Sequence, residues 1–318
     1  MTAVAKVSKA GVYDMDIDIY HSQKACVGPS ISSTGMRMIL RECPKKFFAT
    51  SDLNPNAFPP KDSKAFNFGR AAHCLMLGEP EFASKFVVSP FENFLTKEAK
   101  LWRDKQTKQI VRIDDMATVH LMVEAQRVSP DCARAFKDGE PEKCLIWQDG
   151  ETGVWLKSRP DWLPHKPDKR LISEYKTTET LKPSILSSAA FTYGYEMQAA
   201  LILDAVNIVM EVEPQGVVFI VQEKDPPYMV EARLFTPEQI DFGRLQIRKA
   251  LRIFADCLET GIWPGYSDGP RYFDTPFWVA KAIGDWDDGS DFSKRDTNSD
   301  TGEDAGEGPT ASDYLAAG

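Results

Sequence analysis

The sequence predicts a mixed α+β (or α/β) fold, in which helices pack on a mixed central sheet. Runs with helical periodicity before residue 140 give way to short apolar runs of β type between residues 144 and 176. Helical and β-type runs then alternate up to residue 258. The chain of 318 residues is 42% hydrophobic and 27% charged, which excludes collagen-like, coiled-coil and wholly disordered proteins.

Three helices are predicted before residue 140. The first follows the Ser- and Thr-rich stretch 30–34, which supplies a cap, and it ends before Pro44. The second spans residues 66–78 and the third residues 116–135. This half of the chain is therefore expected to be helical.

The rest of the chain alternates between strands and helices. The predicted strands, in order, are 144–148, 154–159, 170–176, 217–222 and 229–235, and the predicted helices are 187–206 and 237–258. Asp149-Gly150-Glu151-Thr152-Gly153 joins the first two strands as a hairpin turn. No repeat of 20–50 residues is present.

Three segments differ in composition. Residues 1–20 are expected to be flexible, and residues 21–283 form one folded unit with a helical part (21–139) and a core (140–283). Residues 284–318 contain ten acidic and two basic residues and few branched apolar ones, so we expect a disordered acidic tail. The tail carries most of the net charge of −9, and a nearly neutral body can still carry a basic cleft.

The six cysteines and the apolar segments limit the class of protein. No two cysteines stand at C-x-x-C spacing, which argues against zinc-ribbon, iron–sulfur and thioredoxin-type sites. Six reduced and mostly buried thiols are expected instead. No apolar run approaches a membrane span of ~20 residues, and residues 1–9 lack the apolar region of a secretory signal, so a cytoplasmic protein without membrane contact is expected.

Residues 158–178 contain the main candidates for catalysis and metal binding. Glu174 and Lys176 stand two apart in a predicted strand and therefore project from the same face, while Tyr175 projects from the other. Asp161 ends the preceding strand. Two carboxylates and the backbone carbonyl of Tyr175 suit a hard divalent cation, and the lysine can orient or deprotonate a water or stabilise charge on a phosphate.

Pro160-Asp161 followed by Glu174-x-Lys176 resembles the PD-(D/E)xK signature of the restriction-endonuclease-like nucleases. The alternative is a surface ion pair, because an acidic residue two positions before a lysine is common. Gly69-Arg-Ala-Ala-His73 resembles the G-x-x-x-H motif of the RecB-like and RecE-like branches. On a helix these two residues share a face, so the glycine would allow close approach to another backbone and His73 would reach the metal.

Two segments further along extend the resemblance. Tyr195-Glu-Met-Gln198 resembles the Tyr/Gln motif that follows the nuclease core, and both residues would act at the site; related sequences have a tyrosine where Ile202 stands. Residues 251–264 resemble the C-terminal part of exonuclease VIII. The resemblance to RecE-like phage exonucleases thus covers about residues 20–270, with Glu174 where that family normally has Asp.

Two further groups of residues are candidates for function. Related nucleases often have a glutamate before the first core strand, which makes Glu142 a candidate, with Glu140 and Glu151 as alternatives. The segment 97–112 could follow a DNA backbone, with Trp102 packed on a base or sugar; a solvated charged helix is the equal alternative. Its basic residues are Lys97, Lys100, Arg103, Lys105, Lys108 and Arg112.

The resemblance implies a Mg²⁺-dependent 5′-to-3′ exonuclease, with Mn²⁺ as a substitute. His73, Asp161, Glu174 and the Tyr175 carbonyl would hold the metal, and Lys176 would serve catalysis. The implied substrate is the end of double-stranded DNA, left with a 3′ single strand for a RecT-type annealing protein. A ring-like homo-oligomer, encoded by a phage or prophage and acting in the bacterial cytoplasm, is also implied. The alternatives are a catalytically idle DNA-binding scaffold and an endonuclease of the same superfamily.

Overall fold

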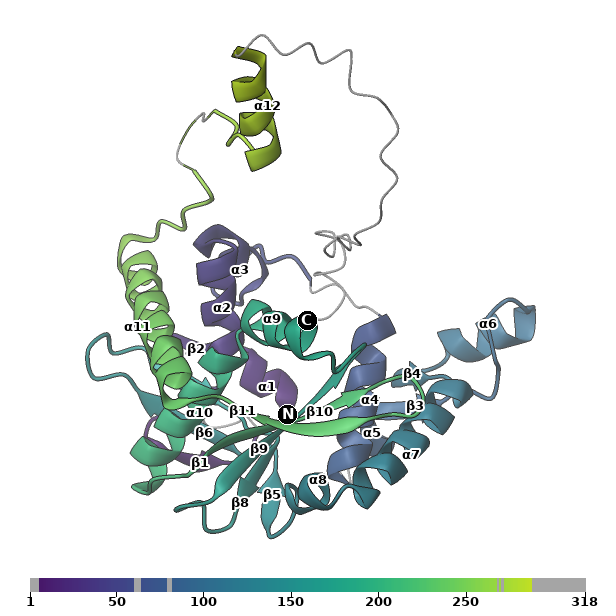
Figure 1. Ribbon diagram of the computed structural model, residues 1–318. Coiled ribbons are helices and arrows are strands. Elements are labelled where there is room, and N and C mark those ends of the chain that lie inside the picture. The colour runs from purple at the N-terminus through teal and green to yellow at the C-terminus, as the bar shows by residue number, and fades with distance from the viewer. Residues whose placement is uncertain (1–5, 60–63, 79–81, 268, 270–271, 288–318) are drawn as a thin grey trace.

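The fold consists of sheets covered by helices on both sides (Figure 1). The computed structural model describes residues 6–59, 64–78, 82–267, 269 and 272–287. Its mixed sheets and flanking helices confirm the predicted α+β class.

The larger sheet has five strands in the order β11-β10-β9-β8-β5. Their bounds are β5 (Gly139–Pro141), β8 (Trp162–Pro164), β9 (Leu171–Thr178), β10 (Gly216–Glu223) and β11 (Val230–Leu234). Strands β9 and β10 run parallel, whereas the other pairs are antiparallel. The parallel pair needs a crossover, which two helices between β9 and β10 supply.

A second sheet has four strands in the order β1-β6-β7-β2, and β3 and β4 form a separate parallel pair. The bounds are β1 (Gly11–Tyr13), β2 (Ser30–Ser32), β3 (Phe86–Val88), β4 (Gln109–Val111), β6 (Cys144–Gln148) and β7 (Trp155–Ser158). The predicted hairpin of β6 and β7 is present, with Leu145 opposite Ser158.

Helices cover the sheets and connect the strands (Figure 1). The first seven are α1 (Ile17–His21), α2 (Ser33–Arg41), α3 (Pro44–Thr50), α4 (Lys64–Leu77), α5 (Phe82–Lys85), α6 (Lys97–Asp104) and α7 (Ile113–Val128). The others are α8 (Pro130–Arg134), α9 (Pro183–Tyr193), α10 (Tyr195–Met210), α11 (Pro237–Thr260) and α12 (Phe277–Asp287).

Strands β9 and β10 are buried on both faces. Ile172 and Phe219 belong to a core cluster with residues of α2, α10 and α11. Tyr175 and Ile220 belong to another, with Ala72 of α4 and residues of α7 and α8. Burial on both faces explains why β10 is an almost continuous apolar run and not an alternating one.

Two helices predicted as continuous are divided in the structure. The predicted helix 187–206 consists of α9 and α10, because Gly194 between them has φ +68°, a left-handed conformation that suits glycine. The predicted helix 116–135 consists of α7 and α8, because Pro130 has no N–H to continue the hydrogen-bond ladder and opens α8 instead. Pro44 likewise opens α3.

The N-terminal segment differs from the flexible one that the sequence predicted. Strand β1 pairs with β6, and the buried Val7 and Tyr20 pack in a small core cluster with Trp155. In the sequence these apolar residues are dispersed among charged ones and form no pattern that predicts burial. They are buried because the distant β6–β7 hairpin packs against them. At the other end, α12 extends four residues past the predicted boundary at 283, into the predicted tail 284–318, and residues 288–318 of that tail lie outside the described residues.

Two of the contacts that fix helix α11 to its neighbours involve Arg248 and Gly243. Arg248 donates hydrogen bonds of 2.8 and 2.9 Å to the carboxylate of Asp149 in the β6–β7 turn. Gly243 lies against α10, where a Cβ would stand 2.5 Å from the carbonyl oxygen of Glu196. Only glycine allows this approach without displacing one of the helices.

The cysteines agree with a further expectation from the sequence. All six cysteines are buried thiols, as predicted. Among the described residues, no helix combines the length and apolar character that crossing a membrane requires.

Candidate active site

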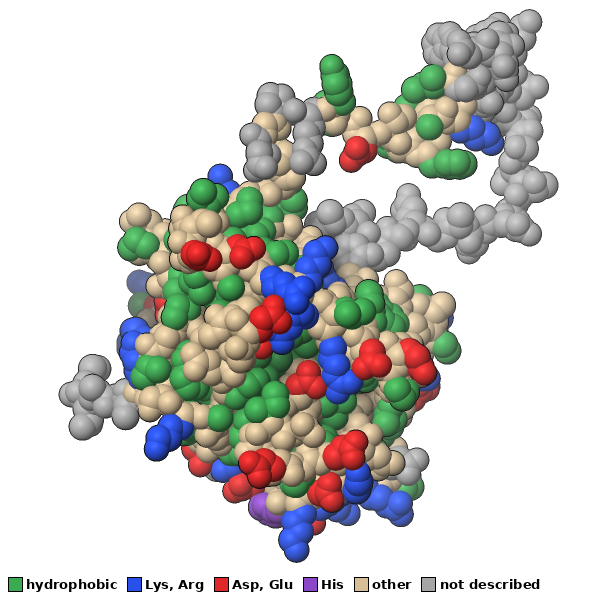
Figure 2. Space-filling view, turned by 90° about the vertical axis from the view of Figure 1, so that its left-hand side faces the viewer, with side chains coloured by type: hydrophobic (Ala, Val, Ile, Leu, Met, Phe, Trp, Pro, Cys, Tyr) green, Lys and Arg blue, Asp and Glu red, His purple; other side chains and the backbone are tan. Residues whose placement is uncertain are grey.

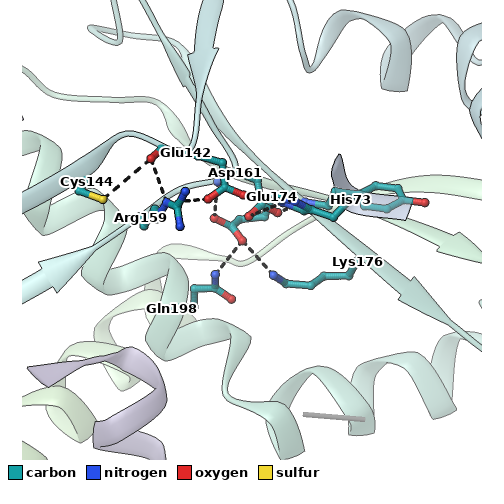
Figure 3. A network of polar contacts seen from close by, with 9 residues as sticks. His73, Glu142, Cys144, Arg159, Asp161, Glu174, Lys176 and Gln198 are labelled. Atoms are coloured by element: carbon teal, nitrogen blue, oxygen red, sulfur yellow. Dashed lines mark hydrogen bonds and ion pairs between the residues drawn. The ribbon is translucent and has the colours of Figure 1, made fainter. Parts of the chain in front are cut away.

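Strand β9 and the turn before β8 bring the signature residues together (Figure 3). Glu174 and Lys176 project from the same face of β9, as their spacing predicted, and Lys176 Nζ lies 2.9 Å from Glu174 Oε2. Tyr175 projects from the opposite face, where its hydroxyl donates to Gln222 Oε1 at 2.8 Å. Asp161 lies in the turn, and its Oδ2 accepts a 2.7 Å hydrogen bond from the Tyr175 N–H.

Three possible metal ligands meet beside β9. His73 of α4 lies between two carboxylates, with its Nε2 3.0 Å from Asp161 Oδ1 and its Nδ1 3.2 Å from Glu142 Oε1. One donor atom from each residue lies within 4.8 Å of the others. The structure therefore brings the predicted His73, Glu142 and Asp161 into one cluster, although they come from separate elements.

Arg159 holds Glu142 in this cluster, and the sequence interpretation gave this arginine no role. Its Nε lies 2.7 Å from Glu142 Oε2 and 3.0 Å from the Glu142 carbonyl oxygen. Glu142 has φ +60°, a left-handed conformation that costs a residue with a side chain roughly 1–2 kcal/mol. Such backbone conformations gather at functional sites, where surrounding contacts stabilise them.

Glu174 forms a second, adjoining cluster. Its Oε1 accepts a 3.2 Å hydrogen bond from the Asp161 N–H, and its Oε2 accepts from Lys176 and, at 2.7 Å, from Gln198 Nε2. The side chain is fully buried. Glu174 is not one of the three clustered donors, so its role as a metal ligand stays a prediction, as does that of the Tyr175 carbonyl.

Tyr195 and Gln198 both reach the site from α10, as their spacing predicted. Lys176 Nζ lies over the Tyr195 ring, 5.6 Å from its centre, and the ring stacks on Phe219 at 5.4 Å. Ile202, which replaces the expected tyrosine one turn further along, is buried in the core. Gln198 and Lys176 bind the same glutamate oxygen, so α10 orients Lys176 through Glu174.

The charges of the cluster shift several pKa values. Burial lowers the pKa of His73, but Asp161 and Glu142 raise it more, so that it lies well above 6.5. Burial raises the pKa of Asp161, but His73 and Lys176 outweigh this and hold it well below 3.8. Burial and the Asp161 charge raise the pKa of Glu174 to about 7 in spite of Lys176. Asp161 and Glu142 thus favour a positive charge between them, which is here the imidazolium of His73.

The donor set fits a divalent cation. Two carboxylate oxygens suit Mg²⁺ and Mn²⁺, and an imidazole nitrogen is an accepted further ligand for transition metals such as Mn²⁺. The ligands also have the outer contacts that metal ligands require, since Tyr175 N–H binds Asp161 and Arg159 binds Glu142. His73, Glu142 and Asp161 would hold the ion.

The other two candidate glutamates lie elsewhere. Glu140 is half exposed and pairs with Lys143 at 3.2 Å. Glu151 lies in the β6–β7 turn and pairs with Arg252 at 2.7 Å. Of the three alternatives, the structure brings only Glu142 to the cluster. In the sequence all three glutamates stand close to a predicted strand, so their distances from it could not distinguish them.

The expectation for Gly69 is wrong. It was expected to let α4 approach another backbone, but a Cβ there would meet no atom of the described residues within 4 Å. His73 is brought to the site by the packing of Ala72 and the rest of α4 on the Tyr175 face of the sheet.

The basic segment 97–112 lies in α6 and β4, at the side of the molecule (Figure 1). Its six basic residues are exposed, and some have partners: Lys108 donates to the Ala83 carbonyl at 2.6 Å, and Arg103 pairs with Asp104. Trp102 packs against Phe91 and Phe94. A role in DNA binding stays a prediction.

A family model describes most of this chain. Residues 32–276 match the "PDDEXK-like domain of unknown function (DUF3799)". The chain belongs to this family. Membership supports a hydrolytic nuclease of the PD-(D/E)xK superfamily, and the matched residues include Pro160-Asp161 and Glu174-x-Lys176, which resemble the signature of that superfamily.

A solved structure shares the fold of this PDDEXK-like domain. A crystal structure from Eubacterium rectale, described as a "putative exonuclease", superposes with a TM-score of 0.57 at 11% identity, covering 85% of this chain and 98% of that one. The structure of SSO0001 gives a TM-score of 0.27 at 12% identity over 80% of this chain and 84% of that one, and carries no argument. No curated protein matches the sequence.

Proposed function

We propose that this protein is a Mg²⁺-dependent deoxyribonuclease of RecE-like type, a 5′-to-3′ exonuclease that degrades one strand from the ends of double-stranded DNA. One observation carries the proposal. His73, Glu142 and Asp161 cluster within 4.8 Å, directly beside the Glu174–Lys176 pair. An acidic cation site next to a protonated lysine suits hydrolysis of a phosphodiester, whose transition state gains negative charge.

His73, Glu142 and Asp161 would hold the cation. When bound, a divalent cation supplies Lewis-acid chemistry, by which it polarises a phosphoryl oxygen and makes water a better nucleophile. Asp161 is fixed for this purpose by the Tyr175 N–H, and Glu142 by Arg159. The chain thereby determines where the phosphate binds relative to Lys176.

Lys176 acts as a cation and not as a base. Burial lowers its pKa, but Glu174 and Asp161 raise it more, so that it lies above 10.5 and the amine stays protonated at neutral pH. A protonated amine orients the attacking water and offsets the charge that develops on the phosphate. Glu174 and Gln198 hold it in place.

Assembly and partners form part of the same proposal. We expect a ring-like homo-oligomer that passes the 3′ single strand to a RecT-type annealing protein in phage recombination in the bacterial cytoplasm. In support, α12 lies apart from the body of the protein and carries exposed apolar side chains (Figure 2): Phe277 is 84% and Trp278 71% exposed. Large exposed apolar groups mark protein contacts. The exposed basic residues of 97–112 are proposed to contact phosphates.

Circular and linear forms of one double-stranded plasmid, incubated with the protein and Mg²⁺, test this function. We expect loss of the linear form alone, release of nucleotides from a 5′ label before a 3′ label, and no reaction with EDTA or with Asp161→Asn. Cutting of the circle would indicate an endonuclease. Binding of DNA ends without cleavage under every metal condition would indicate an idle scaffold.

A further inference from the structure

A small aromatic cavity lies next to the site and has no part in the chemistry described above. It has a volume of about 180 Å³ between α9, β10, β11 and the start of α11. Phe191, Tyr195, Phe219 and Phe235 form its aromatic walls. Val221 lines its floor, and the exposed Arg233 lies at its rim, where it pairs with Glu231.

The cavity adjoins the catalytic strand directly. In the parallel register of β9 and β10, Phe219 is opposite Glu174 and Val221 is opposite Lys176. Paired residues of neighbouring strands project from the same face, and the strands lie only about 4.8 Å apart. The floor of the cavity is therefore one strand away from the two signature residues.

Tyr195 connects the two places. Lys176 Nζ lies over its ring, 5.6 Å from the ring centre. The same ring stacks on Phe219 and lines the cavity. A phosphate held at Lys176 would thus have the cavity on its β10 side, within reach of the sugar and base of the same or the adjoining nucleotide.

The size and lining of the cavity suit one flat ring system. A cavity of about 150 Å³ lined by apolar side chains accepts benzene, so about 180 Å³ accepts an aromatic ring but not a drug-sized molecule. Phe191 and Phe235 meet at 73° and Phe235 and Phe219 at 86°, both with 5.6 Å between ring centres. Rings from several directions can stack on or enclose a base without reading its sequence.

We propose that this cavity binds one nucleobase, unstacked from the duplex, of a nucleotide adjoining the scissile phosphate. The proposal rests on the proposed nuclease function. A nuclease that works from a duplex end needs the terminal base out of the stack before its phosphate can approach the metal site, and an aromatic cavity offsets the loss of stacking.

The test uses DNA duplexes with 2-aminopurine at the first to third positions from the 5′ end, bound to Lys176→Met protein so that cleavage is too slow to interfere with the measurement. Two variants in this background change the cavity. Phe191→Ala removes one wall, and Ser187→Trp fills the mouth from an exposed position that lines it. Ser188→Trp, on the next exposed residue of α9, is the matched control because Ser188 does not line the cavity.

We expect binding to change the 2-aminopurine emission at one position near the end, and the two cavity variants to abolish that change. In otherwise wild-type protein they should weaken DNA binding about 5-fold or more, the lower bound for losing one stacked base, with the control unchanged. Ser187→Trp does not depend on the packing of Phe191, so a folding defect of Phe191→Ala does not decide the result.

Emission changes that persist in both cavity variants would overturn the nucleobase assignment while leaving the nuclease function intact. If the cavity variants instead change the oligomeric state measured by sedimentation and leave the emission unchanged, the cavity binds a side chain of another subunit. The nucleobase assignment is then again wrong. Failure of the proposed function is distinguishable, because the wild-type protein would then not degrade linear DNA from its ends, whatever the cavity variants do to the emission.

Discussion

Replacing Lys176 with methionine keeps an unbranched side chain, shorter by one atom, and removes the charge. The Nζ lies 2.9 Å from Glu174 Oε2 and over the ring of Tyr195, so the substitution takes one cation from the place where the phosphate is expected. Loss of one preorganised group that stabilises developing charge costs about 2.7–4 kcal/mol. We therefore expect the cleavage rate to fall about 10²–10³-fold.

The same substitution should leave the protein folded. Glu174 is fully buried and loses its charged partner, but Gln198 and the Asp161 N–H still bind it at 2.7 and 3.2 Å. Loss of one hydrogen bond to a charged group costs roughly 1.5–3 kcal/mol, against a total stability of about 5–15 kcal/mol.

Single-turnover cleavage of an end-labelled duplex at saturating protein, with a thermal unfolding curve, separates the two effects of Lys176→Met. Lys169→Met is the matched control, because Lys169 forms an exposed ion pair with Glu213 and such pairs contribute about 0–1 kcal/mol. A folded Lys176→Met protein that cleaves within about threefold of the wild-type rate would refute the role of this lysine.

Three further predictions concern pH, packing and the acidic C-terminus. Burial raises the pKa of Asp149, but Arg248 and neighbouring hydrogen bonds lower it to about 2 in the folded protein. The ionised Asp149 should therefore stabilise the fold fully above the unfolded pKa of 3.8, and this stabilisation should disappear as the pH falls toward 2. Asp149→Asn should accordingly destabilise the protein at pH 7 and not at pH 2 in denaturant titrations. Gly243→Ala should lower the melting temperature because the new Cβ would meet a backbone oxygen at 2.5 Å. Gly69→Ala should keep or raise the melting temperature, because the space around Gly69 is open. Equal melting temperatures of the two variants would contradict this packing. Deletion of residues 288–318 should raise DNA affinity at low salt and leave the single-turnover rate unchanged, because acidic groups compete with DNA for basic ones; coinciding affinities throughout a salt series would make these residues bystanders.

Local spacing predicted part of the site from the sequence. Glu174 and Lys176 share a face because strand residues alternate, and Tyr195 and Gln198 share one because a helix repeats about every 3.6 residues. These relations depend only on the backbone of one element. The structure confirms the shared faces, although the chemical role of each residue stays a prediction.

Contacts between distant elements could not be predicted in the same way. Glu142 was one of three glutamates at similar distances from a strand. It is distinguished by the antiparallel strand pairing that places it beside Arg159 and by the packing of α4 that brings His73 to it. The division of a predicted helix at Gly194 was missed because the residues on both sides of this glycine are helical, and a positive φ depends on how the two halves pack.

The central claim is that His73, Glu142 and Asp161 form the cation site of a nuclease, and calorimetric titration with Mn²⁺ tests it most directly. We expect wild-type protein to bind the ion, Asp161→Asn and Glu142→Gln to lose or greatly weaken binding, and Glu140→Gln to bind as the wild type does, because Glu140 pairs with a surface lysine instead. An isotherm of Asp161→Asn that coincides with that of the wild-type protein would show that the cation binds elsewhere, and the account of the site would be wrong.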